Sequence, residues 1–131
     1  MPDPAVWSMR ILIVEDDYKL GSLLEEGLAE EGFATAWVRD GEAALAAALG
    51  DEYDLILLDL MLPRKDGLEV TLALRAAGRQ TPILMLTARD APEDLERARR
   101  AGVNDLMGKP FRFAELVQRI RTLAPDAVNH G

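Results

Sequence analysis

The chain has no cysteine, a single histidine and few aromatic residues, and these absences limit the chemistry that it can carry out. Without cysteine it can form no disulfide, use no thiolate nucleophile and build no zinc–thiolate site. The lone His130 also excludes a histidine metal cluster. No apolar run reaches the roughly 20 residues of a membrane-spanning helix, and Met1 to Pro4 lack the basic flank of a secretory signal. We therefore expect a cytoplasmic protein with no membrane partner.

The composition that remains is that of an ordinary globular domain. The 131 residues are 49% hydrophobic and 29% charged, enough for one layered core and too few for two. The net charge of -8 is unevenly distributed: residues 1–66 carry 15 acidic and 5 basic side chains, whereas residues 67–131 carry 8 and 10. An acidic surface repels phosphate backbones and attracts divalent cations. We expect no nucleic acid contact by the domain itself.

Short apolar segments alternate with segments of helical periodicity along the sequence. Such alternation favours right-handed crossovers, which place helices on both faces of a parallel sheet. We predict an α/β protein with a flavodoxin-like (βα)5 doubly wound parallel sheet and strand order 2-1-3-4-5. The domain is expected to span residues 9–123, after an N-terminal extension (1–8) and before a tail or truncated linker (124–131). Strands are predicted over residues 10–14, 33–38, 53–58, 82–86 and 103–107, and helices over 17–31, 41–49, 68–77, 92–101 and 113–123.

Carboxylates follow two of these predicted strands. Glu15 and Asp16 come after the first strand, and Asp59 comes after the third. The order 2-1-3-4-5 makes these strands neighbours at the point where strand order switches, and sites form there beyond the carboxyl ends. Carboxylates gathered in one cleft stay charged only with a cation, and oxygen ligands favour Mg²⁺. We expect Asp16 and Asp59 to be direct ligands, Glu15 to act through water, and the backbone carbonyl of Met61 to add an oxygen.

A hydroxyl and an ammonium group follow the other two strands of the predicted edge. Thr87 comes after the fourth strand, and Lys109 comes after the fifth with Gly108 between them. Phosphoryl transfer depends mainly on positioning and charge neutralisation, which a metal, a lysine and a hydroxyl together supply. Asp59 would then act as a nucleophile and form an acyl phosphate. Pro110 would fix the direction of Lys109, through a cis bond in one interpretation.

Motifs at these strand ends resemble, in order and spacing, those of two-component response regulator receiver domains. The resemblance covers about residues 9–123. It implies that a sensor histidine kinase phosphorylates Asp59 and that the domain is a phosphoacceptor switch, promoting its own phosphorylation and dephosphorylation, rather than an enzyme. It also implies phosphoryl contacts from Thr87, Lys109 and the backbone of Ala88. The matching segments are Met9 to Asp17, Leu57 to Pro63, Asp66-Gly67, Leu86 to Arg89, Ala101-Gly102 and Lys109-Pro110-Phe111.

The segment Phe111 to Leu116 is most similar to the OmpR-like subfamily, whose members normally continue into a DNA-binding winged helix. That resemblance makes a C-terminal DNA-binding domain plausible and implies a homodimer through helix 4, strand 5 and helix 5. Part of the expected charge set is present, in Asp105, Glu115 and Arg119. Three positions depart from the pattern: Leu106 replaces a switch aromatic, Leu95 replaces an arginine, and Arg100 replaces an acidic residue.

Simpler interpretations stand beside these. Asp17 is expected to cap the first helix, and Trp37 has no site context in the sequence. Leu106 and Gly108 motivate a second hypothesis, a degenerate receiver that binds partners without phosphorylation. A third hypothesis, a phosphatase of the haloacid dehalogenase type, ranks far lower because it needs an aspartate where this chain has Met61. The cognate kinase and signal are not readable from the sequence.

Overall fold

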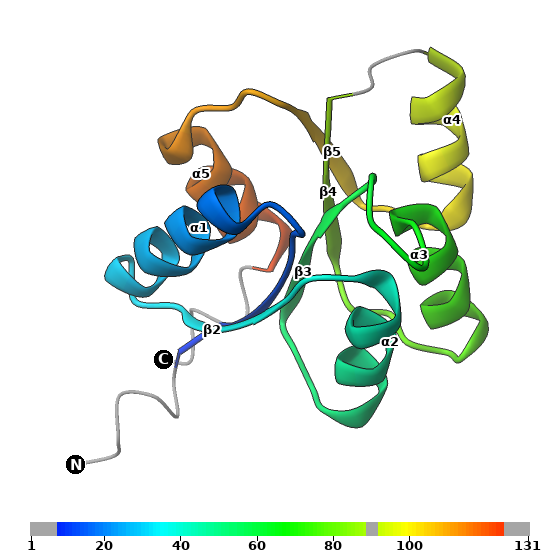
Figure 1. The fold of residues 1–131 in the computed structure, drawn as a ribbon, viewed down its shortest axis with the longest axis horizontal. Coiled ribbons are helices and arrows are strands. Elements are labelled where there is room, and N and C mark those ends of the chain that lie inside the picture. Colours follow the sequence, from blue (N-terminus) through cyan, green and yellow to red (C-terminus); the bar gives the residue numbers. More distant parts are fainter. Residues whose placement is uncertain (1–7, 89–91, 125–131) are drawn as a thin grey trace.

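The computed structural model describes residues 8–88 and 92–124, in which five strands alternate with five helices (Figure 1). The predicted extension and tail, residues 1–8 and 124–131, lie almost entirely outside the described residues. No helix in the described ranges is long and apolar enough to cross a membrane. The elements are β1 (Arg10–Val14), α1 (Tyr18–Glu30), β2 (Ala34–Val38), α2 (Gly41–Gly50), β3 (Leu55–Asp59), α3 (Gly67–Ala76), β4 (Ile83–Thr87), α4 (Pro92–Ala101), β5 (Asp105–Gly108) and α5 (Phe113–Leu123).

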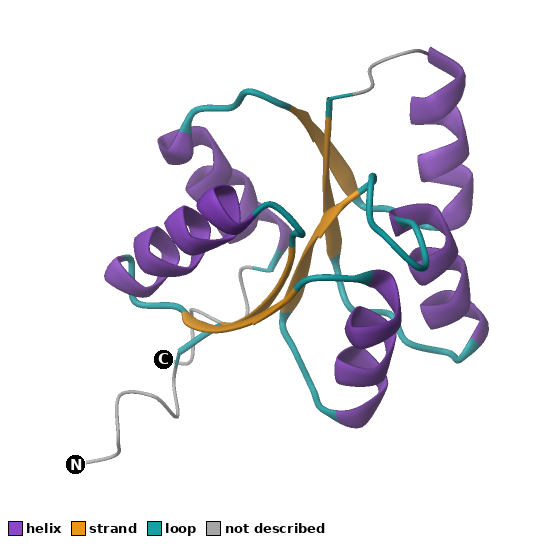
Figure 2. Ribbon diagram, viewed as in Figure 1, coloured by secondary structure: helices purple, strands orange, loops and turns teal. Residues whose placement is uncertain are grey.

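All pairings in the sheet are parallel, and the strand order is β2-β1-β3-β4-β5, which confirms the predicted flavodoxin-like fold. Helices α1 and α5 cover one face, and α2, α3 and α4 cover the other (Figure 2). Because successive strand residues point to opposite faces, Ile11 and Ile13 belong to the core under α1 and α5, while Leu12 and Val14 belong to the core on the other side. A sheet covered twice explains why its inner strands are continuously apolar.

The first predicted strand has the observed bounds, and the other four differ from the observed strands by one or two residues at an end. The fifth strand starts at Asp105 rather than at 103. The Val103 amide donates to the Ala98 carbonyl and so closes the turn after α4, which ends at Ala101 and is followed by Gly102 with φ of 112°. Its end includes Gly108, which pairs with Thr87. The second strand is at the edge, as predicted, but all five of its residues are half-buried, so burial does not alternate along it.

Aspartate side chains fix where three helices begin near the carboxyl edge of the sheet. Asp17 accepts from the Lys19 amide at the start of α1, as predicted, and Asp40 accepts from the Ala43 amide at the start of α2. Asp66 forms a capping box with Glu69 at the start of α3. These caps satisfy backbone amides that have no partner within the helix.

Gly67, the first residue of α3, lies directly against the end of β3. A Cβ at this position would be 2.6 Å from the backbone oxygen of Asp59 and 2.9 Å from Cα of Leu60. Both are backbone atoms, which cannot move aside as a flexible side chain could. The absence of a side chain at residue 67 therefore allows α3 to begin beside Asp59.

We predict that Gly67→Ala destabilises the protein by about 1–3 kcal/mol, because the added methyl overpacks a site bounded by backbone. Gly50→Ala is the matched control, since a Cβ there meets nothing within 4 Å. That change should be neutral or stabilise by about 0.4–1 kcal/mol. Urea unfolding of both variants measures the difference, and equal stabilities would contradict the proposed close approach.

At the opposite edge of the sheet, Arg10 binds the segment before β3. Its guanidinium donates to both carboxylate oxygens of Asp51 at 3.1 and 2.9 Å, and its amide donates to Asp54 at 2.7 Å. The Arg10 guanidinium also lies over the Tyr53 ring at 5.0 Å. The hydrogen bond from Arg10 lowers the pKa of Asp51 from 3.8 to about 2.

This pair predicts a specific acid dependence of stability. Because the pKa of Asp51 is lower in the folded protein, its contribution is present above pH 3.8 and is lost as the pH falls toward 2. The free energy of unfolding should therefore fall less between pH 5 and pH 2 in Asp51→Asn than in the wild type. Denaturant titrations across that range measure it, with Glu26→Gln on the exposed face of α1 as control. Parallel curves for wild type and Asp51→Asn would contradict the assignment.

Candidate functional site at the carboxyl edge of the sheet

The residues predicted from the four strand ends lie together at one edge of the sheet. Asp59 and Thr87 are the last residues of β3 and β4, and Glu15 and Lys109 directly follow β1 and β5. Asp59 is only 4% exposed, Thr87 2% and Glu15 1%. The sequence placed Asp59 and Thr87 in loops, whereas the structure places both inside the sheet's ladder. A buried carboxylate at a strand end needs compensation, and the neighbouring side chains supply it.

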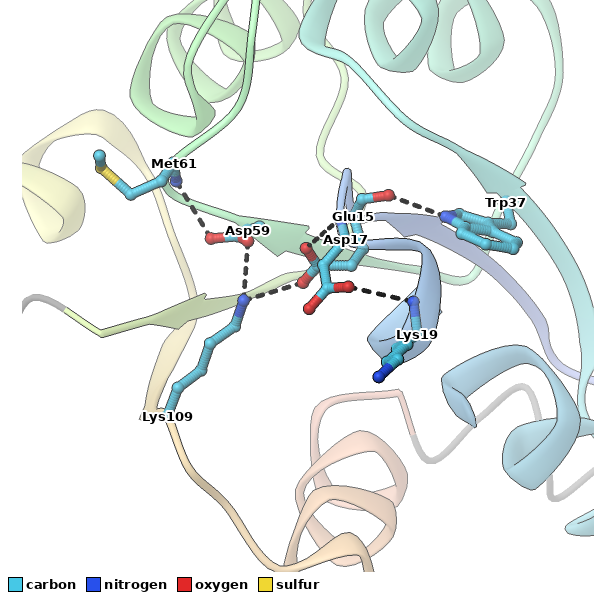
Figure 3. Close-up of polar contacts among 7 residues, drawn as sticks. All are labelled: Glu15, Asp17, Lys19, Trp37, Asp59, Met61 and Lys109. Carbon is cyan, nitrogen blue, oxygen red and sulfur yellow. Dashed lines mark hydrogen bonds and ion pairs between the residues drawn. The ribbon is translucent and has the colours of Figure 1, made fainter. Parts of the chain in front are cut away.

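Lys109 provides that compensation for two carboxylates at once. Its Nζ lies 2.8 Å from Oδ2 of Asp59 and 2.9 Å from Oε1 of Glu15 (Figure 3). Burial lowers the pKa of Lys109, but the hydrogen bonds to Asp59 and Glu15 together outweigh it, so the pKa is raised. Burial raises the pKa of Glu15, and the hydrogen bond from Lys109 opposes that effect. The peptide bond between Lys109 and Pro110 is cis.

Three carboxylates at this edge fit a divalent cation. One ligand oxygen from each of Glu15, Asp16 and Asp59 lies within 4.8 Å of the others. The carboxylates carry three negative charges and Lys109 carries one positive charge, so the cluster has a net charge of −2 when all are ionised. Every donor is an oxygen, which suits Mg²⁺ better than a softer metal. The predicted metal ligands are therefore brought together by the fold.

The amide of Met61 orients the Asp59 carboxylate from the other side. It donates to Oδ1 of Asp59 at 3.1 Å, while Lys109 holds Oδ2 (Figure 3). Both oxygens of this side chain are thus fixed. The predicted role of the Met61 carbonyl as a metal ligand stays a prediction.

Trp37 and Arg39 contact the acidic loop, although sequence reasoning gave them no role. Nε1 of Trp37 donates to the carbonyl of Glu15 at 2.9 Å, and the guanidinium of Arg39 donates to the carbonyl of Asp16 at 2.8 Å. The register of the parallel strands could have predicted these contacts. It pairs Trp37 with Ile13 and so brings the end of β2 beside the loop after β1.

The predicted switch positions lie along β4 and β5. Ala88 is exposed in the bend after β4, next to Thr87. Leu106 is half-buried and packs against the core under α2, α3 and α4, so leucine fills space at the predicted switch position. Gly108 pairs with Thr87, and the Lys109 amide donates to the Thr87 carbonyl at 2.8 Å, which extends the regular ladder to the lysine.

The predicted dimer residues are paired within the chain. Arg119 contacts Asp105 at 3.2 Å and Glu115 at 3.0 Å, and it donates to the Leu106 carbonyl at 2.8 Å. Arg100 pairs with Glu96 along α4. All of these ion pairs are formed within a single chain.

Residues 11–121 match the response regulator receiver domain family, and the chain therefore belongs to this family. The transcriptional regulatory protein PcoR of Escherichia coli is 47% identical over 114 residues, which are 87% of this chain and 50% of PcoR. The transcriptional activator IrlR of Burkholderia pseudomallei is 50% identical over 115 residues, 88% of this chain and 50% of IrlR. These regulators support the OmpR-like assignment. The chain spans about half the length of the curated relatives it matches.

Solved receiver domains have the same fold. The receiver domain of the Francisella response regulator 1452 aligns with a TM-score of 0.87 and 30% identity, covering 91% of this chain and 98% of that one. The receiver domain of the sensor histidine kinase PA1611 from Pseudomonas aeruginosa aligns with a TM-score of 0.83 and 37% identity, covering 90% and 98%. In that structure a magnesium ion is coordinated in the active site cleft. Receiver domains of response regulators are signalling switches that sensor histidine kinases phosphorylate.

We predict that Lys109→Met lowers the free energy of unfolding by about 3–5 kcal/mol, because it leaves two buried carboxylates without their shared cation. Adding Glu15→Gln should restore part of that loss, since only one buried charge then remains. A double-mutant cycle from chemical unfolding without divalent cations measures the coupling. Strictly additive effects would contradict the bridging role of Lys109.

Proposed function

We propose that this receiver accepts a phosphoryl group on Asp59 in a Mg²⁺-dependent reaction and changes conformation to control an output. The observation that carries the proposal is the Asp59 carboxylate itself. It is buried, both of its oxygens are held, and two further carboxylates lie within 4.8 Å of it. A carboxylate oriented before the phosphoryl donor arrives can attack without reorganisation.

In the proposed reaction an oxygen of Asp59 attacks the phosphorus of a kinase phosphohistidine. The new O–P bond forms as the N–P bond breaks, and the histidine nitrogen leaves with the electron pair. Glu15, Asp16 and Asp59, with the Met61 carbonyl, would hold the Mg²⁺. The cation, when bound, supplies positive charge to the phosphoryl oxygens.

After transfer, the chain's own groups stabilise the acyl phosphate. Lys109 exchanges its contact with the Asp59 carboxylate for a phosphoryl oxygen, and the Thr87 hydroxyl and the Ala88 amide donate to the others. Hydrolysis by water returns Asp59 to a carboxylate. The same pocket thus promotes both gain and loss of phosphate, and the chain acts as a switch rather than as an enzyme on a separate substrate.

A groove beside the site fits the approach of the kinase. It has a volume of about 820 Å³ and lies between α1 and the segment after β5, with Lys109 among its lining residues. Leu20 and Leu23 line it from α1, and Leu23 is 66% exposed. An apolar helix of the kinase docked here would place its phosphohistidine next to Asp59. Lys19, also at the groove, would contribute charge to partner choice.

The remaining proposals concern the whole protein. Residues 9–123 are the receiver, 1–8 an extension and 124–131 a tail or a linker to a DNA-binding domain, as in the transcriptional regulators that the chain resembles. The protein works in the cytoplasm. A homodimer through α4, β5 and α5 is possible only if Arg119 exchanges its intrachain partners for those of a second copy.

The alternative of a phosphorylation-independent interaction module is less favoured, because the acidic pocket and its lysine are complete. The two functions differ in one observable property. If the chain is a constitutive module, the Asp59→Asn variant should bind its partners as well as the wild type does. If it is a phosphoryl switch, the variant should not.

We predict that acetyl phosphate with Mg²⁺ adds one phosphoryl group to the wild-type chain, detected as a mass increase and located at Asp59 by fragmentation. Asp59→Asn should stay unmodified, and chelation of Mg²⁺ by EDTA should abolish labelling, because the phosphoryl oxygens then lose the cation that offsets their charge. Asp17→Asn is the control, because asparagine still caps α1. An unmodified wild-type chain under conditions that label another receiver would refute the proposal.

A further inference from the structure

The end of β2 holds the loop that carries two of the three clustered carboxylates. Trp37 donates to the Glu15 carbonyl and Arg39 to the Asp16 carbonyl, at 2.9 and 2.8 Å. Between these two residues, the Val38 carbonyl accepts from the Glu15 amide at 3.1 Å. Three consecutive residues thus bind the backbone of two consecutive loop residues. Figure 3 shows the indole of Trp37 on the side of Glu15 that faces away from Lys109.

These contacts matter most for Asp16. The Glu15 carboxylate is held directly, because Lys109 donates to one oxygen and the Asp17 amide to the other. The Asp16 side chain is exposed, and no hydrogen bond or ion pair to its carboxylate is present within residues 8–88 and 92–124. Its direction is therefore set by its backbone, and Arg39 fixes that backbone at the carbonyl.

The two donors are themselves held against α1. The rings of Tyr18 and Trp37 are 5.6 Å apart, and the guanidinium of Arg39 lies 5.7 Å from the Tyr18 ring. Gly21, one turn along α1, leaves room for the indole, since a Cβ there would overlap the ring. Tyr18 therefore contacts both donors. We call Trp37 and Arg39, with the aromatic contact to Tyr18, the loop clamp.

We infer that the loop clamp positions Glu15 and Asp16 for divalent cation binding, so that Trp37 and Arg39 are positioning residues of the cation site. This inference rests on the proposed Mg²⁺ site. It has a counterintuitive consequence for Arg39. A guanidinium near a cation site repels the cation, so removing it would strengthen binding if charge were its only effect. If Arg39 acts by holding the Asp16 carbonyl, removing it weakens binding.

The test is a calorimetric titration of the metal-free chain with Mg²⁺ alone. Arg39→Met and Trp37→Phe should each weaken binding about tenfold, the lower end of the effect of residues that orient metal ligands. Arg121→Met is the matched control for charge, because Arg121 lies at the far end of α5 and pairs with Glu31. Unchanged or tighter binding by Arg39→Met would overturn the inference. Urea unfolding without Mg²⁺ separates a loss of stability from a loss of affinity.

A spectroscopic measurement tests the clamp without altering it. The chain has two tryptophans, so Trp7→Phe leaves Trp37 as the only indole. Its N–H resonance should shift on Mg²⁺ addition with the same midpoint as the calorimetric titration, because its acceptor belongs to a ligand residue. An indole resonance that does not move would contradict the inference.

These outcomes separate the inference from the proposed function. Wild-type chain that binds no Mg²⁺ and takes no label from acetyl phosphate would overturn both. Wild-type chain that binds Mg²⁺ and labels on Asp59, with variants that bind equally well, would overturn the loop clamp alone.

Discussion

The ammonium group that Asp59 and Glu15 share is the interaction on which the edge of this sheet depends. Both carboxylates are buried and close together, and a neighbouring cation offsets the free-energy cost of burying them. Lys109 supplies it from the end of β5, an edge strand, by reaching past β4 to Asp59 at the end of β3 and Glu15 just after β1. One side chain therefore links the ends of strands that span four adjacent positions in the sheet, from β5 to β1. The fold is what allows this, because parallel strands all end at the same edge.

The same arrangement makes the site suitable for a divalent cation. Lys109 neutralises part of the charge and leaves a net −2 when all four groups are ionised, which favours a cation. The contacts that fix the cluster come from outside it, from the amide of Met61 on one side and from Trp37 on the other. Both oxygens of Glu15 and both of Asp59 accept hydrogen bonds, so these two carboxylates are held in fixed directions before any ligand arrives.

Periodicity and strand-end motifs were enough to predict the fold, the sheet order and the cluster of Glu15, Asp16, Asp59 and Lys109, because parallel strands force their ends together. Contacts that depend on register were not predictable in the same way. Trp37 and Arg39 became visible only when β2 was aligned with β1. The start of β5 was missed because a backbone hydrogen bond assigns Val103 to the end of α4. The sequence also could not show that Arg119 pairs with Asp105 and Glu115 of its own chain, because the same charges could pair between two copies in a dimer.

β5 joins the site to helix α5. Its last residue precedes Lys109, and its first two residues, Asp105 and Leu106, are both bound by Arg119 from α5. In the proposed reaction Lys109 would exchange a carboxylate for a phosphoryl oxygen, and Lys109 directly follows the strand that carries the Arg119 contacts. The Arg119 ion pairs are partly exposed, so each contributes only about 0.2–1 kcal/mol. Such weak pairs can exchange partners at little cost, which makes β5 a suitable link even though Leu106 provides no aromatic ring to move.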